Sequence, residues 1–169
     1  DGREASTIKG RIAGTAVITE GGEKIGLVGA TTQLLASIAS PGAVTVIGDD
    51  INDMPQLAAI LQPKIDALIA QGINKIVVMS HLQQFALEQA LTPLLSGIDI
   101  VISAGNHSLF ADAQDPLRGG DVPVATYPVL LSNRDGDPVL QINSTAEYAY
   151  VNRLVVEFDA LGRVVPSSV

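Results

Sequence analysis

KIVVMSH at residues 75–81 and IDIVIS at residues 98–103 decide the fold of this chain. Both stretches are short aliphatic runs, which is the pattern of strands buried inside a layered protein. A helical pattern over residues 84–96 lies between them and ends at Gly97. A strand, a helix and a second strand in this order predict two parallel strands that are covered on at least one face.

The segments upstream of this unit predict a hairpin and two short elements. Gly21-Gly22 separates TAVITE at residues 15–20 from EKIGLVG at residues 23–29, a two-residue hairpin signal between apolar stretches. A short helix is expected over residues 31–39. A brief strand is expected over residues 43–47.

The longest predicted helix covers residues 53–71. Asp53 is a suitable N-cap, Pro55 is acceptable in the first turn, and Gly72 follows the helix end. Leucine and isoleucine residues recur at helical spacing and form one apolar stripe. Pro63 falls inside this pattern, so the helix should kink or split there.

The downstream part of the chain predicts irregular structure followed by β-strands. Residues 104–123 are rich in Gly, Asp and Pro and read as a loop. Three strands are expected after it: VATYPVLLS at 124–132, PVLQINS at 138–144 and YAYVNRLVVEFD at 148–159. Asn133, Asp135 and Asp137 alternate like calcium ligands, but Pro138 stands where a calcium loop needs glycine, so a hairpin turn is expected. The order predicts an α/β fold, with strand–helix–strand units followed by antiparallel strands in one domain, residues 1–169.

Composition excludes several classes of protein. Hydrophobic residues make up 47% of the 169 residues and charged residues 17%, so the chain can bury a core and is not disordered. The net charge of −8 argues against nucleic acid or an anionic membrane surface as a partner. The chain has no cysteine, which excludes disulfides, thiolate metal sites and cysteine nucleophiles. No run reaches the roughly 18 apolar residues that a membrane span needs.

The two histidines of the chain follow the two strands that decide the fold. His81 directly follows the first strand, and His107 comes three residues after the second. The carboxyl ends of neighbouring parallel strands open on one crevice, where ligands gather in α/β folds. Two imidazoles at that edge could bind one metal ion, for which zinc, iron and nickel are suited and manganese less strictly so. The alternative is that both are surface or hydrogen-bonded residues, and two histidines alone make an incomplete catalytic metal site.

A second candidate site is the glycine-containing stretch Gly26–Thr32. It resembles a phosphate-binding turn, but it lacks the spacing of the dinucleotide and P-loop motifs. Close packing of a strand against a helix is the favoured interpretation of its glycines.

Five pieces of the chain, in order, are similar to motifs of one enzyme family. The family is the 5'-nucleotidase and alkaline phosphatase-like branch of the calcineurin-like metallophosphoesterases, in the later part of the catalytic domain. The matching pieces are Gly22–Gly29, Val77–His81, Gly97–Val101, Gly105–Ser108, and Tyr150–Leu154 with Phe158-Asp159. They extend over residues 15–160.

The resemblance implies a partial four-layer α/β/β/α metallophosphoesterase sandwich and a centre of two divalent metal ions, zinc, manganese or iron. His81 and His107 match two late ligands of the second metal, and Asn106 is expected to contact the substrate. A further ligand of the family falls on Leu109, which cannot coordinate a metal. The family's early motifs are not found, since no histidine precedes His81, so no catalytic residue is assigned.

Two functions follow, and a third is weaker. The first is a part of a metal-dependent phosphoric ester hydrolase, of phosphatase or 5'-nucleotidase type, that is incomplete and inactive alone. Its expected partners are a small phosphate ester and an N-terminal part of the same domain, and the family's habit suggests a periplasmic or extracellular location. The second is a non-catalytic binding or structural domain with a degenerate phosphoesterase fold, suggested by Leu109. The third is a Rossmann-like nucleotide binder that uses Gly26–Thr32.

Overall fold

A single mixed β-sheet organises the described part of the chain. The computed structural model describes residues 13–47 and 51–169, and its strands form one six-stranded sheet in the order β1-β2-β3-β4-β6-β5. The strands are β1 (Thr15–Glu20), β2 (Glu23–Thr31), β3 (Ile76–His81), β4 (Ile100–Ser103), β5 (Val129–Ser132) and β6 (Pro138–Asn143). The four central strands β2, β3, β4 and β6 run parallel, and the edge strands β1 and β5 run antiparallel to their neighbours.

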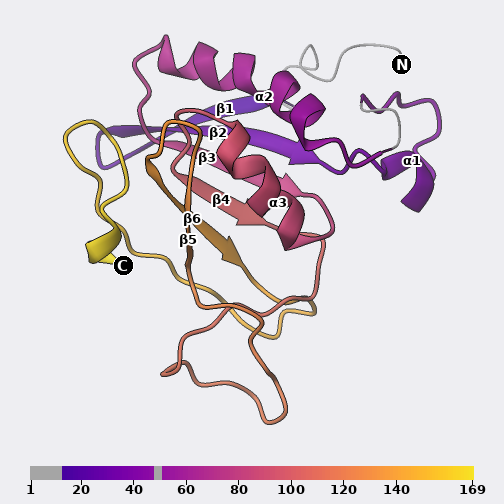
Figure 1. Ribbon diagram of the computed structural model, residues 1–169, viewed down its shortest axis with the longest axis vertical. Coiled ribbons are helices and arrows are strands. Elements are labelled where there is room, and N and C mark those ends of the chain that lie inside the picture. Colours follow the sequence, from indigo (N-terminus) through magenta and orange to yellow (C-terminus); the bar gives the residue numbers. More distant parts are fainter. Residues whose placement is uncertain (1–12, 48–50) are drawn as a thin grey trace.

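Two helices cover one face of this sheet (Figure 1). They are α2 (Met54–Ile69) and α3 (Phe85–Leu91), which continues into the 3-10 turn η2 (Thr92–Leu94). Two further short pieces are α1 (Leu35–Ile38) and the 3-10 turn η3 (Pro166–Ser168). The main core lies between the helices and the sheet, and its fully buried members include Ile65, Ile76, Val78, Leu91 and Leu95. None of the helices in the described ranges is long and apolar enough to span a membrane.

The long helix α2 begins and ends close to the predicted positions. The Asp53 carboxylate caps it by accepting a hydrogen bond from Gln56 N at 2.8 Å. The helix is not split at Pro63 and runs unbroken to Ile69. Pro63 is on the exposed side of the helix, where the carbonyl group that it leaves without a partner can bind water.

The strand–helix–strand prediction is confirmed. β3 and β4 are parallel neighbours in which Val78 pairs with Val101. The helix between them is shorter than expected, because Pro93 turns its last residues into η2. The hairpin prediction is also confirmed, since β1 and β2 are joined by Gly21 and Gly22, both with positive φ.

Three sequence-based expectations about local structure are corrected. Residues 43–47 form no strand, and Val44 and Ile47 are exposed, so no core contact holds the segment extended. The helix expected over 31–39 is a single turn, because β2 continues to Thr31. Residues 148–157 form no strand and pair with none of the six strands of the sheet.

The expected antiparallel strands are found only in part. β5 and β6 form an antiparallel pair, but β6 itself runs parallel to β4. The parallel pairing places the carboxyl end of β6 beside the carboxyl ends of β3 and β4.

The stretch Gly26–Thr32 is mostly strand, so its interpretation as a phosphate-binding turn is wrong. Gly26 to Thr31 pair with residues 76–81 of β3 in an unbroken parallel ladder. The packing role of glycine is confirmed at Gly26. A Cβ atom there would lie 3.0 Å from Leu68 Cδ1 and 3.3 Å from Ile73 Cγ2, so glycine lets the helix side approach the strand.

The opposite face of the sheet is apolar and only partly covered. Alternation along the strands places Val77 and Met79 of β3, with Ile102 of β4, on this face. Met79 is 48% exposed, and Val77 and Ile102 are half-buried. Residues 158–169 cover part of the face, where Lys75 Nζ lies 5.7 Å from the centre of the Phe158 ring.

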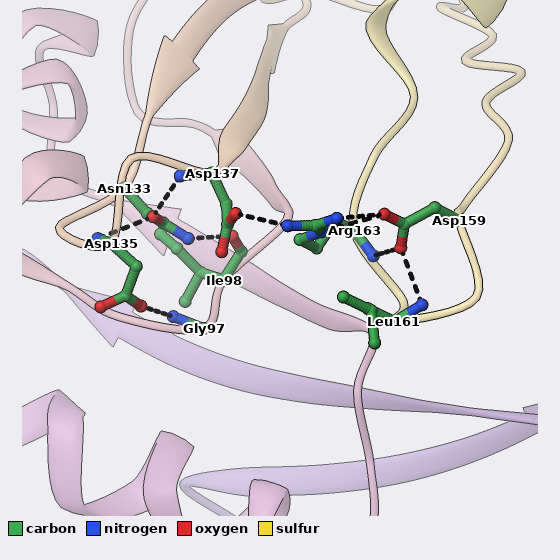
Figure 2. A network of polar contacts seen from close by, with 8 residues as sticks. All are labelled: Gly97, Ile98, Asn133, Asp135, Asp137, Asp159, Leu161 and Arg163. Carbon is green, nitrogen blue, oxygen red and sulfur yellow. Dashed lines mark hydrogen bonds and ion pairs between the residues drawn. The ribbon is translucent and has the colours of Figure 1, made fainter.

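The turn between β5 and β6 is built around Asn133 (Figure 2). Its Oδ1 accepts hydrogen bonds from the backbone nitrogens of Asp135 and Asp137 at 2.9 and 3.0 Å, while its Nδ2 donates to Ile98 O at 3.3 Å. The expected hairpin turn is confirmed. Arg163 then bridges Asp137 and Asp159, which ties the C-terminal segment to this turn (Figure 2).

Asp99 of the GIDIV stretch has a structural role at this end of the sheet. Its Oδ2 accepts a hydrogen bond from Ile76 N at 2.7 Å, so the carboxylate joins the start of β3 to the start of β4. Asp99 is only 6% exposed. Burial raises its pKa to about 7, against the lowering effect of the bond from Ile76, and Asp137 raises it further.

This raised pKa makes stability depend on pH. The folded protein holds the Asp99 proton up to about pH 7, whereas the unfolded chain releases it near pH 4. The free energy of unfolding is therefore expected to fall as pH rises from 4 to 7, by up to about 4 kcal/mol. Asp99→Asn keeps an oxygen acceptor for Ile76 and should remove this part of the pH dependence in denaturant titrations. The exposed carboxylate Asp112, changed to Asn, is the control, and an unchanged slope in Asp99→Asn would contradict the assignment.

Candidate metal and phosphate site

The sheet brings both histidine-bearing segments to the same edge. His81 is the last residue of β3, and the segment Ala104–Ser108 continues directly from the end of β4. The two strands are parallel neighbours, so both ends open on the same side, above the long loop at the lower end of the sheet (Figure 1). Both histidines are exposed.

Gly105 is the point where the two segments touch. It has a φ of +88°, and a Cβ atom on it would lie 2.7 Å from His81 Nε2 and would also overlap Cδ2 of the same ring. The imidazole of His81 therefore lies directly against the backbone of the loop that carries Asn106 and His107. The glycine is needed both for the backbone conformation and for this close approach.

Asn106 is held by an amide pair with Asn143 at the end of β6. Asn106 Nδ2 donates to Asn143 Oδ1 at 3.2 Å, and Asn143 Nδ2 donates to Asn106 Oδ1 at 3.1 Å. The same Asn106 oxygen accepts from Ser108 N at 3.0 Å, and Asn143 Nδ2 also bonds to Ser108 O. The loop after β4 is thereby fixed to the neighbouring strand.

The same loop is tied to the chain beyond β6. Thr145 Oγ1 donates to His107 O at 3.0 Å, and Asn152 Nδ2 donates to Asn143 O at 2.9 Å. The bond from Thr145 positions the backbone of His107, while the His107 side chain is exposed. A cavity of about 260 Å³ lies next to the loop, with Asn152 and Leu109 among its lining residues.

Leu109 is a buried apolar residue of this edge. It is 7% exposed, and its carbonyl oxygen accepts a hydrogen bond from Val124 N at 2.9 Å. The position that carries a ligand in the family's motif is therefore used here for packing.

Glu88 of α3 lies beneath the end of β3 and was not singled out from the sequence. It is fully buried, and burial raises its pKa, although a hydrogen bond from Ser80 acts in the opposite direction. A signal was present in the sequence, because Glu88 follows Phe85 by three residues on the apolar face of the helix. Asn143 was not predicted as a site residue because the strand that ends with it was expected to be antiparallel, whereas β6 runs parallel to β4.

The donor chemistry of this edge fits part of a metal centre. Two imidazoles are suitable ligands for zinc, manganese or iron, and neither ring nitrogen of His81 or His107 has a hydrogen-bond partner within residues 13–47 and 51–169. In those same residues no group of three or more His, Cys, Asp or Glu side chains is close enough together to hold a metal ion. Two imidazoles alone do not complete a catalytic metal centre, which typically has three protein ligands.

Comparison with known proteins shows which proteins this chain is related to. Bovine 5'-nucleotidase is 30% identical over 163 residues, and snake venom 5'-nucleotidase from Crotalus adamanteus is 28% identical over 167 residues. These matches cover 96% and 99% of this chain. The chain is homologous to 5'-nucleotidases. The resemblance found in the sequence motifs is therefore confirmed.

Solved structures give the same relationship at the level of the fold. The 5'-nucleotidase precursor from Thermus thermophilus superposes with a TM-score of 0.76 at 29% identity. The NAD nucleotidase of Haemophilus influenzae superposes with a TM-score of 0.77 at 26% identity, and each match covers 96% of this chain. The α/β fold class, as a partial metallophosphoesterase sandwich, is confirmed.

The matched region is a limited part of these relatives. The chain spans 27% of the length of the bovine and Crotalus proteins and about 30% of the two solved chains. No protein-family model matches the chain.

Proposed function

We propose that this chain forms the later part of the catalytic domain of a metal-dependent phosphoric ester hydrolase of 5'-nucleotidase type. The observation that carries the proposal is the contact between the His81 ring and Gly105, which joins the two histidine-bearing segments at one edge of the sheet. The homology to 5'-nucleotidases over nearly the whole chain supports it. In this proposal residues 1–169 belong to a single domain.

His81 and His107 are the metal ligands in this account. A bound divalent ion would supply an activated water nucleophile and neutralise charge on the phosphoryl oxygens. The chain holds the two ligand-bearing segments in place: β3 and Gly105 hold His81, and the bond from Thr145 to the His107 carbonyl holds the backbone of His107. The remaining ligands of this ion, the ligands of the other metal of the centre and the group that protonates the leaving group come from the rest of the domain.

Asn106 is the proposed substrate contact. An asparagine amide nitrogen carries two hydrogens, and among the described residues one of them is donated to Asn143. The second is suited to a phosphate oxygen beside the metal ligands. Because Asn143 and Ser108 already fix the amide plane, the donor is preorganised for an anion.

The partly covered face of the sheet is the proposed contact with the rest of the domain. Met79, Val77 and Ile102 offer an apolar surface suited to a second sheet. This packing would complete the four-layer sandwich, with the two layers described here forming one half. A periplasmic or extracellular location is proposed from the relatives, one of which is named as a venom protein.

The test is hydrolysis of an aryl phosphate and of a nucleoside monophosphate by the complete protein that contains this chain, with its metal content measured in parallel. The account predicts bound divalent metal and hydrolysis that a chelator abolishes. Asn106→Ala should raise KM by about tenfold, the equivalent of one charge-assisted hydrogen bond, while the metal content stays the same. An inactive, metal-free complete protein would instead favour the non-catalytic binding domain.

A further inference from the structure

A fully buried carboxyl group lies directly beneath the strand end that carries His81. Glu88 belongs to α3, and its side chain faces the sheet, where it has no exposed surface. Burying a carboxyl group is costly, and its Oε2 has no hydrogen-bond partner within the described residues. An apolar side chain would fill this position at a lower cost, so packing alone does not account for the carboxyl group.

The other carboxyl oxygen binds the two residues that flank His81. Ser80 Oγ donates to Glu88 Oε1 at 2.8 Å, and Leu82 N donates to the same oxygen at 3.4 Å. The Ser80 hydroxyl also lies 3.1 Å from Ile102 O, but the carboxyl oxygen is the closer acceptor. One oxygen atom thus binds the side chain immediately before His81 and the backbone nitrogen immediately after it.

These restraints fix the direction of the His81 side chain. Side chains alternate along a strand, so holding Ser80 toward α3 directs His81 to the opposite side. The His81 carbonyl accepts from Thr32 N at 3.0 Å, which holds the backbone from the β2 side. The ring then lies against Gly105, and a rotation of the strand end would move it away from the loop that carries His107.

We propose that Glu88 is a positioning residue for the metal ligand His81. It acts through Ser80 and Leu82 and touches neither metal nor substrate. The proposal rests on the proposed function, in which His81 binds a divalent ion.

The test compares Glu88→Leu with Glu88→Gln in the complete protein. Glutamine keeps the Oε1 acceptor, whereas leucine removes it and retains similar bulk. The readouts are the dissociation constant for Mn²⁺, measured by titration with electron paramagnetic resonance on folded protein, and the melting temperature. Glu88→Leu is expected to weaken Mn²⁺ binding by about 10-fold or more, as loss of an outer-shell partner typically does. Glu88→Gln should stay within about threefold of the original protein.

Several outcomes would overturn the proposal. One is a Glu88→Leu protein that melts earlier but binds Mn²⁺ with unchanged affinity, because the role would then be structural only. Another is an equal loss of affinity in Glu88→Gln. Gln89→Ala, a change at the neighbouring position of α3, is the control and should leave the affinity unchanged.

Two further variants keep the test decisive. If Glu88→Leu does not fold, Ser80→Ala removes the 2.8 Å bond between Ser80 and Glu88 with a smaller change. Ser80→Ala should weaken Mn²⁺ binding several-fold. An unchanged affinity would overturn the proposal. His81→Ala distinguishes a failure of the proposed function from a failure of the positioning role of Glu88. If it leaves Mn²⁺ binding intact, the proposed function itself fails; if it abolishes binding while the Glu88 and Ser80 variants have no effect, only the positioning role fails.

Discussion

Replacing His81 with alanine in the complete protein is expected to lower the affinity for its metal by more than about 100-fold. Loss of an outer-shell partner alone typically costs about 10- to 100-fold, and a direct ligand should cost more. His107→Ala should act in the same way, because both imidazoles serve one ion. Metal content after dialysis and hydrolysis of an aryl phosphate are the measurements, and both should fall together.

The control for these variants is Gln84→Ala. Gln84 is exposed, lies three residues from His81 and makes no side-chain cap to α3, so metal content and activity should not change. If both histidine variants kept full metal content and activity, the two imidazoles would be ordinary surface residues, and the proposed ligand roles would be wrong.

Gly105→Ala is expected to disrupt the site without replacing either proposed ligand. The new methyl group would overlap the His81 ring, and the backbone at φ +88° is unfavourable for alanine by about 1–2 kcal/mol. The ring or the loop must therefore move. Metal affinity should fall by at least about tenfold, and the free energy of unfolding should fall by about 1–3 kcal/mol. Metal titration and denaturant unfolding are the two measurements.

Two glycines of the same loop separate these effects. Gly120 has a φ of +93°, and nothing lies within 4 Å of the position that a Cβ atom would take there, so Gly120→Ala should lose stability through backbone strain but keep its metal affinity. Gly119 has neither the positive φ nor a close neighbour, so Gly119→Ala should resemble the original protein. If Gly105→Ala lost no more metal affinity than Gly120→Ala, the contact with His81 would not matter for the site.

The central part of the fold was predictable because local signals and packing agree there. β3 and β4 are continuous aliphatic runs joined by a helix, and that pattern has few alternatives to a parallel pair. The Asp53 cap and the Gly21-Gly22 hairpin were read correctly because each is set by local backbone chemistry.

The sequence-based predictions that were wrong depend on which distant segments of the chain pair as strands. An apolar stretch such as residues 148–157 has strand propensity, but propensity alone does not bring it beside a partner strand. Whether β6 pairs parallel with β4 depends on the path of the 104–128 loop, which no local pattern encodes.

The candidate site was predictable as far as its histidines and no further. Strand ends are visible in the sequence, so His81 and His107 could be placed at one edge. The contact of Gly105 with the ring, the amide pair of Asn143 with Asn106, and the buried carboxyl of Glu88 all depend on which elements pack together. The roles of these residues therefore become visible only in the tertiary structure.

The most direct test of the central claim is anomalous X-ray diffraction from crystals of the complete protein, recorded at the absorption edge of its bound metal. The account predicts an anomalous peak at coordination distance, roughly 2.0–2.2 Å, from a ring nitrogen of His81 and a ring nitrogen of His107. A metal peak bound elsewhere, with both imidazoles free in solvent, would contradict it.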